Sequence, residues 1–248
     1  MGNKFVVLSD IHANLSALKA VIQDFKDKYS PDGVILLGDL INYGMRPNEV
    51  ISEIKLLSLE FPIICNLHGN HERALIDSEQ LPRFSSERGR TILEYTKRVL
   101  TRDSFEYVYN QMEIEGYSEL LIHGCSILCV HGSLRDVYWG KLSPESMKDG
   151  GYARYDYVLS GHSHIPHHVE MFYSGGLPEL RGKKRTVFLN PGSVGQPRNQ
   201  NPSAQYLYWD MEAGLFHQNS VNYDIELEQS LYTDEVDVFY RDRLFKGI

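Results

Sequence analysis

Aspartate and histidine side chains, which are common metal ligands, gather at a few points of this sequence. The segment 159–168, LSGHSHIPHH, holds four of the ten histidines in the 248-residue chain. A second point is DIH at residues 10–12. Imidazole nitrogens together with carboxylate oxygens suit manganese, iron, cobalt, nickel or zinc. The residue types therefore indicate metal chemistry, with a surface cluster or a coincidence of composition as the alternative.

Each of these Asp- and His-containing segments follows a short run of apolar residues. Runs of three or four apolar residues bounded by Gly, Ser or Asp are typical of strands buried on both faces. Five such runs occupy residues 5–8, 34–37, 63–65, 127–130 and 157–159. In an open α/β sheet, ligands bind beyond the carboxyl ends of the strands. We therefore expect one site formed by the polar residues after these runs, which are Asp10, His12, Asp39, Asn70, His71, His131, His162 and His164.

A simpler explanation of any one of these residues is a turn residue or a helix cap. That explanation would have to hold at five strand ends together, which is why a shared site is favoured. Residues 10 and 12 are two apart, as are residues 162 and 164. In an extended chain this spacing places both side chains on one side. We therefore expect each pair to converge on one point.

Helical patterns separate the first three runs, over residues 14–28 and 47–59. The order strand–helix–strand–helix–strand predicts a mostly parallel sheet with helices packed against it. Helical periodicity continues through about 86–111, which predicts a helical excursion at about 73–112 beside the sheet. Strands dominate from residue 118 onward, and we predict them at 119–123, 126–130, 156–160, 168–173, 185–190, 205–211 and 214–221.

The remaining segments carry weaker signals. Gly182 and the basic run 183–185 are expected to form a solvated hairpin turn. The polar and aromatic tail, 224–246, is expected to include a helix packed on the outside. No repeat or linker composition interrupts the sequence, so residues 1–248 are predicted to form a single domain.

The net charge of −8 argues against a general nucleic-acid binder, which needs a basic surface to neutralise phosphates. It does not argue against a phosphorylated substrate, because a bound metal reverses the local field. Two divalent ions about 3.5–4 Å apart can hold an attacking hydroxide between them and neutralise phosphoryl oxygens on both sides. An acidic chain and an anionic substrate are therefore compatible.

The sequence indicates a cytoplasmic protein. No apolar run approaches the roughly 20 residues that span a bilayer, and the first apolar run is too short for a signal peptide. Cys65, Cys125 and Cys129 each lie within an apolar run, and none belongs to a Cys-x-x-Cys pair. Buried, reduced thiols are the favoured interpretation of all three.

Five motifs in order resemble the calcineurin-like metallophosphoesterases. They are DIH at 10–12, GD at 38–39, GNHE at 69–72, HG at 131–132 and GHSH at 161–164. Two longer stretches, GDLINYGMRPNEV at 38–50 and NPGSVGQPRN at 190–199, resemble the small prokaryotic branch of phosphoesterases and dinucleoside polyphosphate hydrolases. The resemblance implies a two-sheet αββα sandwich of the α/β class with metals at the strand ends.

The resemblance also implies a role for each polar residue. One metal ion would be held by Asp10, His12, Asp39 and His164. The second ion would be held by Asp39, Asn70, His131 and His162, so that Asp39 bridges the pair. Mn or Fe is implied first, with Zn, Co or Ni as alternatives. His71 would bind no metal and would protonate the leaving-group oxygen or stabilise its charge, which suits an imidazole.

Residues outside the motifs are candidates for substrate contact. The protein Ser/Thr phosphatases carry GDxxDRG, whereas residues 38–44 here are GDLINYG, which disfavours a phosphoprotein substrate. Arg198 is the first candidate for phosphate binding and Arg135 the second, because a guanidinium matches phosphate geometry. Tyr43 is a candidate for stacking on a base or sugar, or else a packed loop aromatic. His167 and His168 are expected at the surface.

The predicted function is a dinuclear metal-dependent phosphoesterase that cleaves P–O bonds with a metal-bridging hydroxide. The substrate would be a small phosphorylated compound, a nucleotide or a dinucleoside polyphosphate of the Ap4A type. The alternatives are a nuclease or phosphodiesterase of the same superfamily and a non-catalytic scaffold with this fold. The excursion at 73–112 follows His71 directly, and we expect it to overhang the cleft and limit substrate size. The sequence leaves the ester class, the metal and the oligomeric state open.

Overall fold

The computed structural model describes residues 2–175 and 181–248. Its first sheet has the strand order β10-β9-β1-β2-β3. The predicted parallel arrangement of the first three strands is confirmed, because β1 pairs with β2 and β2 with β3 in parallel. β9 and β10 return antiparallel on the other side of β1. The five strands are β1 (Lys4–Leu8), β2 (Gly33–Leu36), β3 (Ile63–Asn66), β9 (Ala204–Asp210) and β10 (Leu215–Val221).

The second sheet has the order β4-β5-β6-β8-β7. Its three central strands run parallel, and both edge strands are antiparallel to their neighbours. The strands are β4 (Tyr117–Ile122), β5 (Cys125–Val130), β6 (Tyr157–Ser160), β7 (His167–Ser174) and β8 (Lys183–Asn190). Each strand predicted from residue 118 onward is present, and its ends differ from the prediction by at most two residues.

The predicted turn at the basic run 183–185 is wrong, because these residues begin β8. The pairing of β8 with β7 includes these residues, and two of the three basic side chains have an acidic partner. Lys184 pairs with Asp156, and Arg185 Nη1 lies 3.4 Å from Glu170 Oε1. Cross-strand ion pairs of this kind stabilise a ladder, which is why a basic run can continue a strand.

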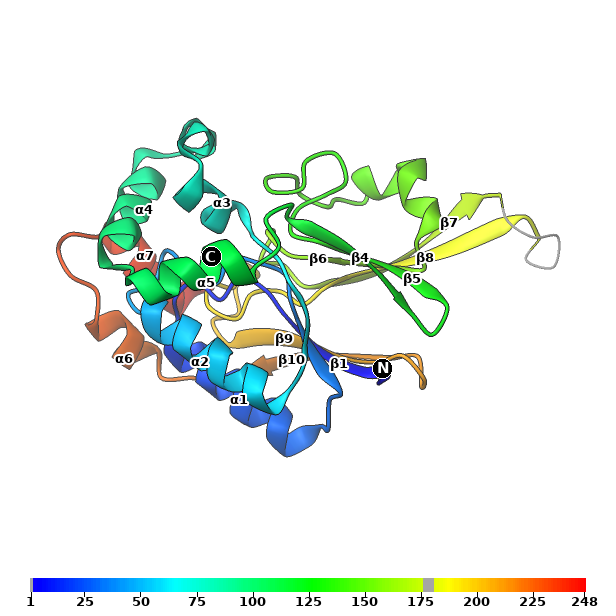
Figure 1. Ribbon diagram of the computed structural model, residues 1–248, viewed down its shortest axis with the longest axis horizontal. Helices are drawn as coiled ribbons and strands as arrows, with labels where there is room; N and C mark the ends of the chain where they lie inside the picture. The colour runs from blue at the N-terminus through cyan, green and yellow to red at the C-terminus, as the bar shows by residue number, and fades with distance from the viewer. Residues whose placement is uncertain (1, 176–180) are drawn as a thin grey trace.

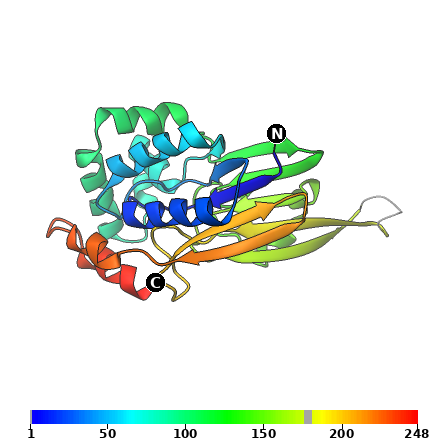
Figure 2. The ribbon, with the colours of Figure 1, turned by 90° about the horizontal axis from the view of Figure 1, so that it is seen from below.

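The two sheets pack face to face between layers of helix (Figure 1; Figure 2). One apolar cluster fills the space between the sheets, with Val7 and Ile35 from the first sheet and Leu159 from the second. The helices α1 (Leu15–Lys28) and α2 (Pro47–Glu60) pack on the outer face of the first sheet. The 3-10 helices η2 (Ser146–Lys148) and η3 (Gly150–Arg154) cover the outer face of the second. The predicted αββα sandwich is confirmed, with 3-10 helices as its last layer.

Helix α1 shows how the sequence specifies these layers. The Asn14 side chain caps it by accepting a hydrogen bond of 3.0 Å from Ala17 N. Leu18, Val21 and Phe25 recur at helical spacing and are fully buried against the sheet. The cap satisfies a backbone N–H that has no partner within the helix, and the apolar stripe supplies the packing free energy.

The segment between β3 and β4 is helical. It consists of α3 (Asn70–Ile76), η1 (Ser78–Arg83), α4 (Glu87–Val99) and α5 (Arg102–Gln111). The continuous pattern at 86–111 is divided because Thr101 caps α5, its hydroxyl accepting from Ser104 N at 3.2 Å. The tail forms α6 (Ile225–Ser230) and α7 (Val238–Lys246). Figure 1 shows α4 and α7 at the same end of the molecule, where Ile92 packs with Tyr240.

Two smaller expectations concern cysteines and membranes. Cys65 and Cys129 are buried, Cys125 is half-buried, and all three are free thiols. Across residues 2–175 and 181–248, no helix combines the length and apolar character that crossing a bilayer requires.

Candidate metal centre

The eight polar residues that follow the five apolar runs come together at one edge of the two sheets. β1, β2 and β3 carry three groups to this edge, and β5 and β6 of the other sheet carry two. Most of the side chains are buried, and Asp10, His12 and His131 are fully so. Segments more than 150 residues apart thus meet at a single polar cluster inside an otherwise apolar core.

The predicted geometry of the two spaced pairs is wrong, because neither pair is extended and because His162 and His164 belong to different groups of ligand atoms. The pairs at 10 and 12 and at 162 and 164 do not lie on extended chain, since φ is +53° and +50° for the first pair and +61° and +57° for the second. Asp39 is also left-handed, with φ +56°. This conformation costs a non-glycine residue about 1–2 kcal/mol. Such strain persists only where the surroundings enforce it, as at binding sites.

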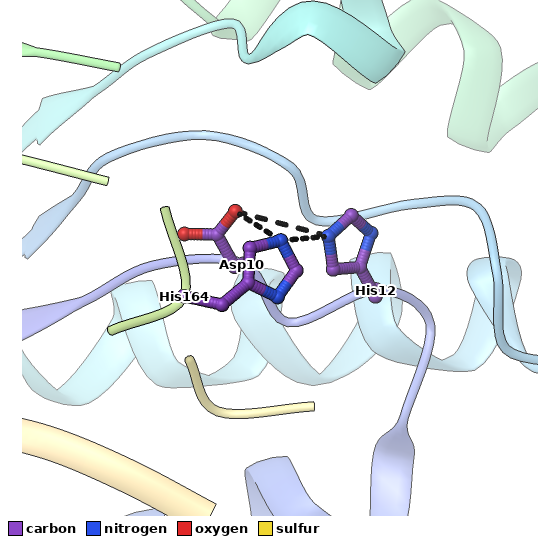
Figure 3. Close-up of side chains that lie close together, drawn as sticks. All are labelled: Asp10, His12 and His164. Carbon is purple, nitrogen blue, oxygen red and sulfur yellow. Dashed lines mark hydrogen bonds and ion pairs between the residues drawn. The ribbon is translucent and has the colours of Figure 1, made fainter. Parts of the chain in front are cut away.

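The first cluster consists of Asp10, His12 and His164, whose ligand atoms face one another (Figure 3). His164 Nε2 lies 3.1 Å from Asp10 Oδ1 and 3.2 Å from His12 Nε2. His12 Nε2 lies 3.8 Å from the same Asp10 oxygen. Two imidazole nitrogens and a carboxylate oxygen at these separations can share one cation.

A second cluster consists of Asp39, Asn70, His131 and His162. His131 Nε2 is 3.1 Å from Asn70 Oδ1 and 3.3 Å from Asp39 Oδ2. His162 presents its other nitrogen, Nδ1, at 2.9 Å from Asn70 Oδ1. Asp39 Oδ2 also lies 3.7 Å from His12 Nε2 of the first cluster. One carboxylate oxygen therefore faces both clusters.

Each carboxylate in these clusters has one oxygen tied to the protein and one without a hydrogen bond. Asp10 Oδ2 accepts from Ser9 Oγ at 2.6 Å and from His162 N at 3.0 Å. Asp39 Oδ1 accepts from His71 N at 3.0 Å. Asp10 Oδ1 and Asp39 Oδ2 are buried and accept no hydrogen bond from the described residues. A buried, unpaired carboxylate oxygen is unfavourable, so these two oxygens fit a bound cation.

Backbone carbonyls orient three of the four histidines. Nδ1 of His12 lies 3.2 Å from Ile41 O, Nδ1 of His131 2.7 Å from Leu37 O, and Nδ1 of His164 2.6 Å from Gln196 O. A carbonyl oxygen only accepts, so Nδ1 must carry the proton of a neutral ring, whose Nε2 then presents its lone pair to the cluster. This is the arrangement that metal-binding histidines adopt.

Burial keeps most of these rings neutral. It lowers the pKa of His162 to about 3 and the pKa of His12 and His164 well below the usual value. Burial acts in the same direction on His131, but the Asp39 carboxylate beside it raises the pKa of His131 to about 9. That proton occupies the place that a cation between His131 and Asp39 would take.

His71 lies beside the clusters but is held differently. Its Nε2 is 3.9 Å from Asp39 Oδ2, and its Nδ1 is 2.5 Å from Asn42 Nδ2. The Asn42 carbonyl accepts from Thr96 Oγ1 of α4 at 3.0 Å, which orients the Asn42 amide toward the ring. Because the amide donates to Nδ1, the proton of a neutral ring resides on Nε2. Burial favours this neutral form by lowering the pKa of His71 to about 4.

Sequence analysis gave no role to Glu72, the last residue of GNHE. Its fully buried carboxylate accepts backbone hydrogen bonds from Asp39 N at 2.9 Å, Ile41 N at 3.1 Å and Gly69 N at 2.9 Å. Burial raises the pKa of Glu72 to about 7. Glu72 thereby ties the loop after β2 to the loop after β3. In the sequence, the position of Glu72 within the GNHE motif was the signal that could have indicated this role.

A cleft of about 360 Å³ opens onto the clusters. Apart from the candidate ligands, His71 and Ser85, its lining is cationic and aromatic. We call these residues the cleft wall: Tyr43, Arg83, Phe84, Trp139, Lys141 and Arg198. Arg198 and Tyr43 are thus in the cleft, as the sequence predicts for substrate contact. The other four were not singled out from the sequence, since they belong to no motif.

Two predicted substrate residues are placed in unexpected surroundings. Arg135 is exposed and outside the lining of the cleft, with its Nε 2.9 Å from Asp149 Oδ2. Tyr43 stacks on Tyr240 at 4.7 Å between ring centroids and contacts the rings of His12 and His71, at 4.5 Å each. These contacts occupy its ring and leave less of it for stacking on a base.

His167 and His168, the other histidines of the opening segment, begin β7. His168 is exposed as expected, whereas His167 is half-buried and its Nε2 has no hydrogen bond among the described residues. Neither residue lines the cleft.

The sequence model of a protein family, the calcineurin-like phosphoesterase superfamily domain, matches residues 4–214 of this chain. The chain belongs to this superfamily. The match includes both clusters and ends before α6 and α7. Families of this kind hold divalent metal ions, in keeping with three groups of carboxylate and imidazole atoms among the described residues. Two of them are the clusters above, and the third joins His71 to His12 and Asp39.

Similar proteins support the same assignment. The protein MJ0912 of Methanocaldococcus jannaschii is 30% identical to this chain, and the match covers 97% of each. The structure of a metallophosphoesterase from Sphaerobacter thermophilus superposes with a TM-score of 0.76 at 25% identity, covering 99% of this chain and 100% of that one. The hypothetical protein PH1004 from Pyrococcus horikoshii OT3 shares the fold with a TM-score of 0.83 at 20% identity, covering 99% and 98%.

Proposed function

We propose that this protein is a dinuclear metal-dependent phosphoesterase that hydrolyses P–O bonds. The observation that carries the proposal is the pair of buried carboxylate oxygens, Asp10 Oδ1 and Asp39 Oδ2, that face histidine nitrogens and accept no hydrogen bond from the described residues. Two cations would satisfy both oxygens. The family membership of the chain supports phosphate ester chemistry at such a centre.

We assign the ligands in two sets that share Asp39. Asp10, His12, Asp39 and His164 would hold one ion, and Asp39, Asn70, His131 and His162 the other. When bound, divalent ions in this arrangement supply a hydroxide nucleophile near neutral pH and positive charge for the phosphoryl oxygens. The chain's own contribution is to fix the ligand directions, through the backbone carbonyls behind His12, His131 and His164.

His71 would serve the leaving group. The Asn42 amide holds the ring with its Nε2–H free to donate, and this nitrogen lies 3.9 Å from the proposed bridging oxygen of Asp39. A donor at that position can stabilise or protonate the oxygen of the departing alkoxide. Because Nδ1 faces Asn42, the ring is oriented for this role without being a metal ligand.

The substrate proposed is a small phosphorylated compound, a nucleotide or a dinucleoside polyphosphate. The volume of the cleft, about 360 Å³, is in the range of small-molecule sites. Lys141 and Arg198 in the cleft wall provide positive charge for phosphate groups, although the chain as a whole is acidic. Arg83, also in the cleft wall, is paired with Asp136. Residues 83–85 of the helical segment line the cleft, which supports the expectation that this segment limits substrate size.

The proposal is tested with bis(p-nitrophenyl) phosphate after loading the protein with Mn, Fe, Co, Ni or Zn, together with metal analysis. We expect about two ions per chain, turnover with at least one of these metals, and loss of turnover on chelation that re-addition of the metal reverses. Absence of turnover with all five metals in a protein that binds two ions would favour a non-catalytic scaffold instead.

A further inference from the structure

The loop that contacts His71, residues 42–44, is left-handed at two consecutive positions. Asn42 and Tyr43 have φ of +70° and +64°, a conformation that costs free energy for residues other than glycine. The Asn42 amide donates to His71, and the Tyr43 ring packs nearly perpendicular to the His71 ring at 4.5 Å between centroids. Such a conformation persists only where neighbouring groups enforce it. The orientation of His71 therefore depends on what holds this loop.

The C-terminal segment holds the loop from outside. Tyr232, which follows α6, donates from its hydroxyl to the backbone oxygen of Tyr43 at 3.0 Å. Tyr240 of α7 is buried and stacks on the Tyr43 ring, with 4.7 Å between centroids and 20° between planes. We propose that Tyr232 and Tyr240 are positioning residues, which hold Asn42 and Tyr43 in the conformation that orients His71 toward the leaving group.

Helix α6 is itself fixed to the body of the molecule. Glu228 is buried, accepts from Ser16 N at 2.7 Å and pairs with the guanidinium of Arg46. Arg46 also donates from Nη2 to Ser16 Oγ at 2.7 Å. This network joins α6 to the first turn of α1 and to the residue before α2, three positions after Tyr43. A buried ion pair with additional hydrogen bonds holds its partners in one geometry, so the segment that bears Tyr232 is a rigid support.

The loop is held on its inner side as well. Gly44 N donates to His12 O at 3.0 Å, and a Cβ at Gly44 would lie only 2.5 Å from that oxygen. The Tyr43 ring also contacts the His12 ring, but the Ile41 carbonyl fixes His12 through its Nδ1. The orientation of His71 is the one that comes through Asn42 of this loop. Loosening the outer support should therefore disturb His71 and leave the proposed metal ligands in place.

This inference assigns α6 and α7 a part in the reaction, although both helices lie beyond residues 4–214, which match the superfamily. Neither tyrosine lines the cleft, so each would act through the loop and not by contact with the substrate. The effect on turnover rests on the proposed function, because it requires that His71 serve the leaving group. The effect on the ring of His71 does not.

The first test is a double-mutant cycle with His71→Ala, followed as kcat of the metal-loaded protein for bis(p-nitrophenyl) phosphate. Tyr232→Phe removes one hydroxyl and should lower kcat about two- to tenfold, the range for one hydrogen bond, with KM and metal content unchanged. In the His71→Ala background the same substitution should change kcat by less than about twofold, because the group that it positions is gone. Tyr95→Phe removes a hydroxyl from the same apolar cluster and is the control.

A second pair of variants tests the stacked ring. Tyr240→Leu should lower kcat by up to about tenfold, as the loss of an aromatic pair implies. Tyr240→Phe keeps the ring that stacks on Tyr43 and should restore most of the activity. A loss of kcat for Tyr232→Phe or Tyr240→Leu that is equal with and without His71 would overturn the proposal, and so would rates within twofold of wild type for both variants.

A measurement without turnover separates this inference from the proposed function. NMR of the histidine ring nitrogens in the metal-free protein shows which nitrogen of His71 carries the proton, with His71→Ala to assign the signals. In the wild type we expect the proton on Nε2, because Asn42 donates to Nδ1. Tyr240→Leu should give a mixture of both neutral forms. If no metal supports turnover, the proposed function fails, and an unchanged His71 signal in Tyr240→Leu would then be the result that overturns the positioning role.

Discussion

The metal centre and the cleft wall face the same cavity but consist of different types of side chain. The metal centre uses short Asp, Asn and His side chains that follow buried strands, and backbone groups hold Asp39, His131 and His164 from behind. The cleft wall uses long Arg and Lys side chains and aromatic rings from the loop after β2, from η1 and the residue after it, and from the loops after β5 and β8. Short side chains held by a hydrogen bond keep their atoms in place, whereas long side chains adapt to what they bind.

The comparison separates the groups proposed for the chemistry from the groups proposed for substrate contact. Both sets lie within the residues that match the superfamily. A substitution in the metal centre should therefore change metal content or kcat, whereas a substitution in the cleft wall should change substrate binding. The predictions below test this separation, starting with the change that should matter most.

Asp39→Asn should abolish turnover, with a loss of at least about 10⁴-fold. The neutral amide would bind the two cations more weakly than the carboxylate does, and the bound ions supply several kcal/mol of transition-state stabilisation. Each 1.36 kcal/mol lost corresponds to a tenfold lower rate. Metal analysis should show fewer than two ions per chain. Asp27→Asn, an exposed acid on α1, is the charge-matched control. Two tightly bound ions and near-normal rates in Asp39→Asn would remove the shared carboxylate from the proposed centre.

His71→Ala should lower kcat by about 10²–10⁴-fold, the range for a general acid or base. Metal content should stay at the wild-type value, because Nδ1 of His71 faces Asn42 and its Nε2 is assigned to the leaving group. Measuring both quantities on one sample separates the two roles. A fall in metal content together with activity would make His71 a ligand.

Asn42→Ala tests whether the hydrogen bond from Asn42 to His71 matters for catalysis. We expect kcat to fall about 10–100-fold, the usual effect of losing an outer-shell partner, with KM and metal content unchanged. Thr96→Val, which removes the hydrogen bond that orients the Asn42 amide, should lower kcat by about tenfold at most. Thr91→Val, at an exposed position of the same helix, is its control. An effect on KM alone would place Asn42 in substrate binding.

Arg135→Ala should change kcat and KM by less than about twofold, as is usual for an exposed side chain away from a site. Arg135 pairs with Asp149 and does not line the cleft. Steady-state kinetics on one loaded preparation are sufficient. A rise in KM of more than about twofold would mean that Arg135 contacts the substrate and belongs to the cleft wall.

Local sequence patterns carried most of the fold. The helices at 15–28 and 47–60 and the ten strands within residues 2–175 and 181–248 follow from the pattern of apolar residues, because burial selects apolar side chains. The basic run 183–185 was misplaced, because its acidic partners Asp156 and Glu170 come from elsewhere in the chain. The division of the helical segment at Thr101 depends on a cap, which is a local signal that periodicity alone does not register.

The sequence by itself determined which residue types stand at the ends of the buried strands. An apolar run and the polar residues that follow it are neighbours in the chain, so both can be recognised without the structure. Only the tertiary structure decided which carboxylate oxygen is unpaired and which imidazole nitrogen faces the centre. It also decided that Asp10 and His12 face one cluster, whereas His162 and His164 face different ones. It also decided that Arg243 reaches Tyr43 while Arg135 turns to Asp149. The direction of a long side chain depends on contacts between segments far apart in the chain, and no spacing along the chain encodes them.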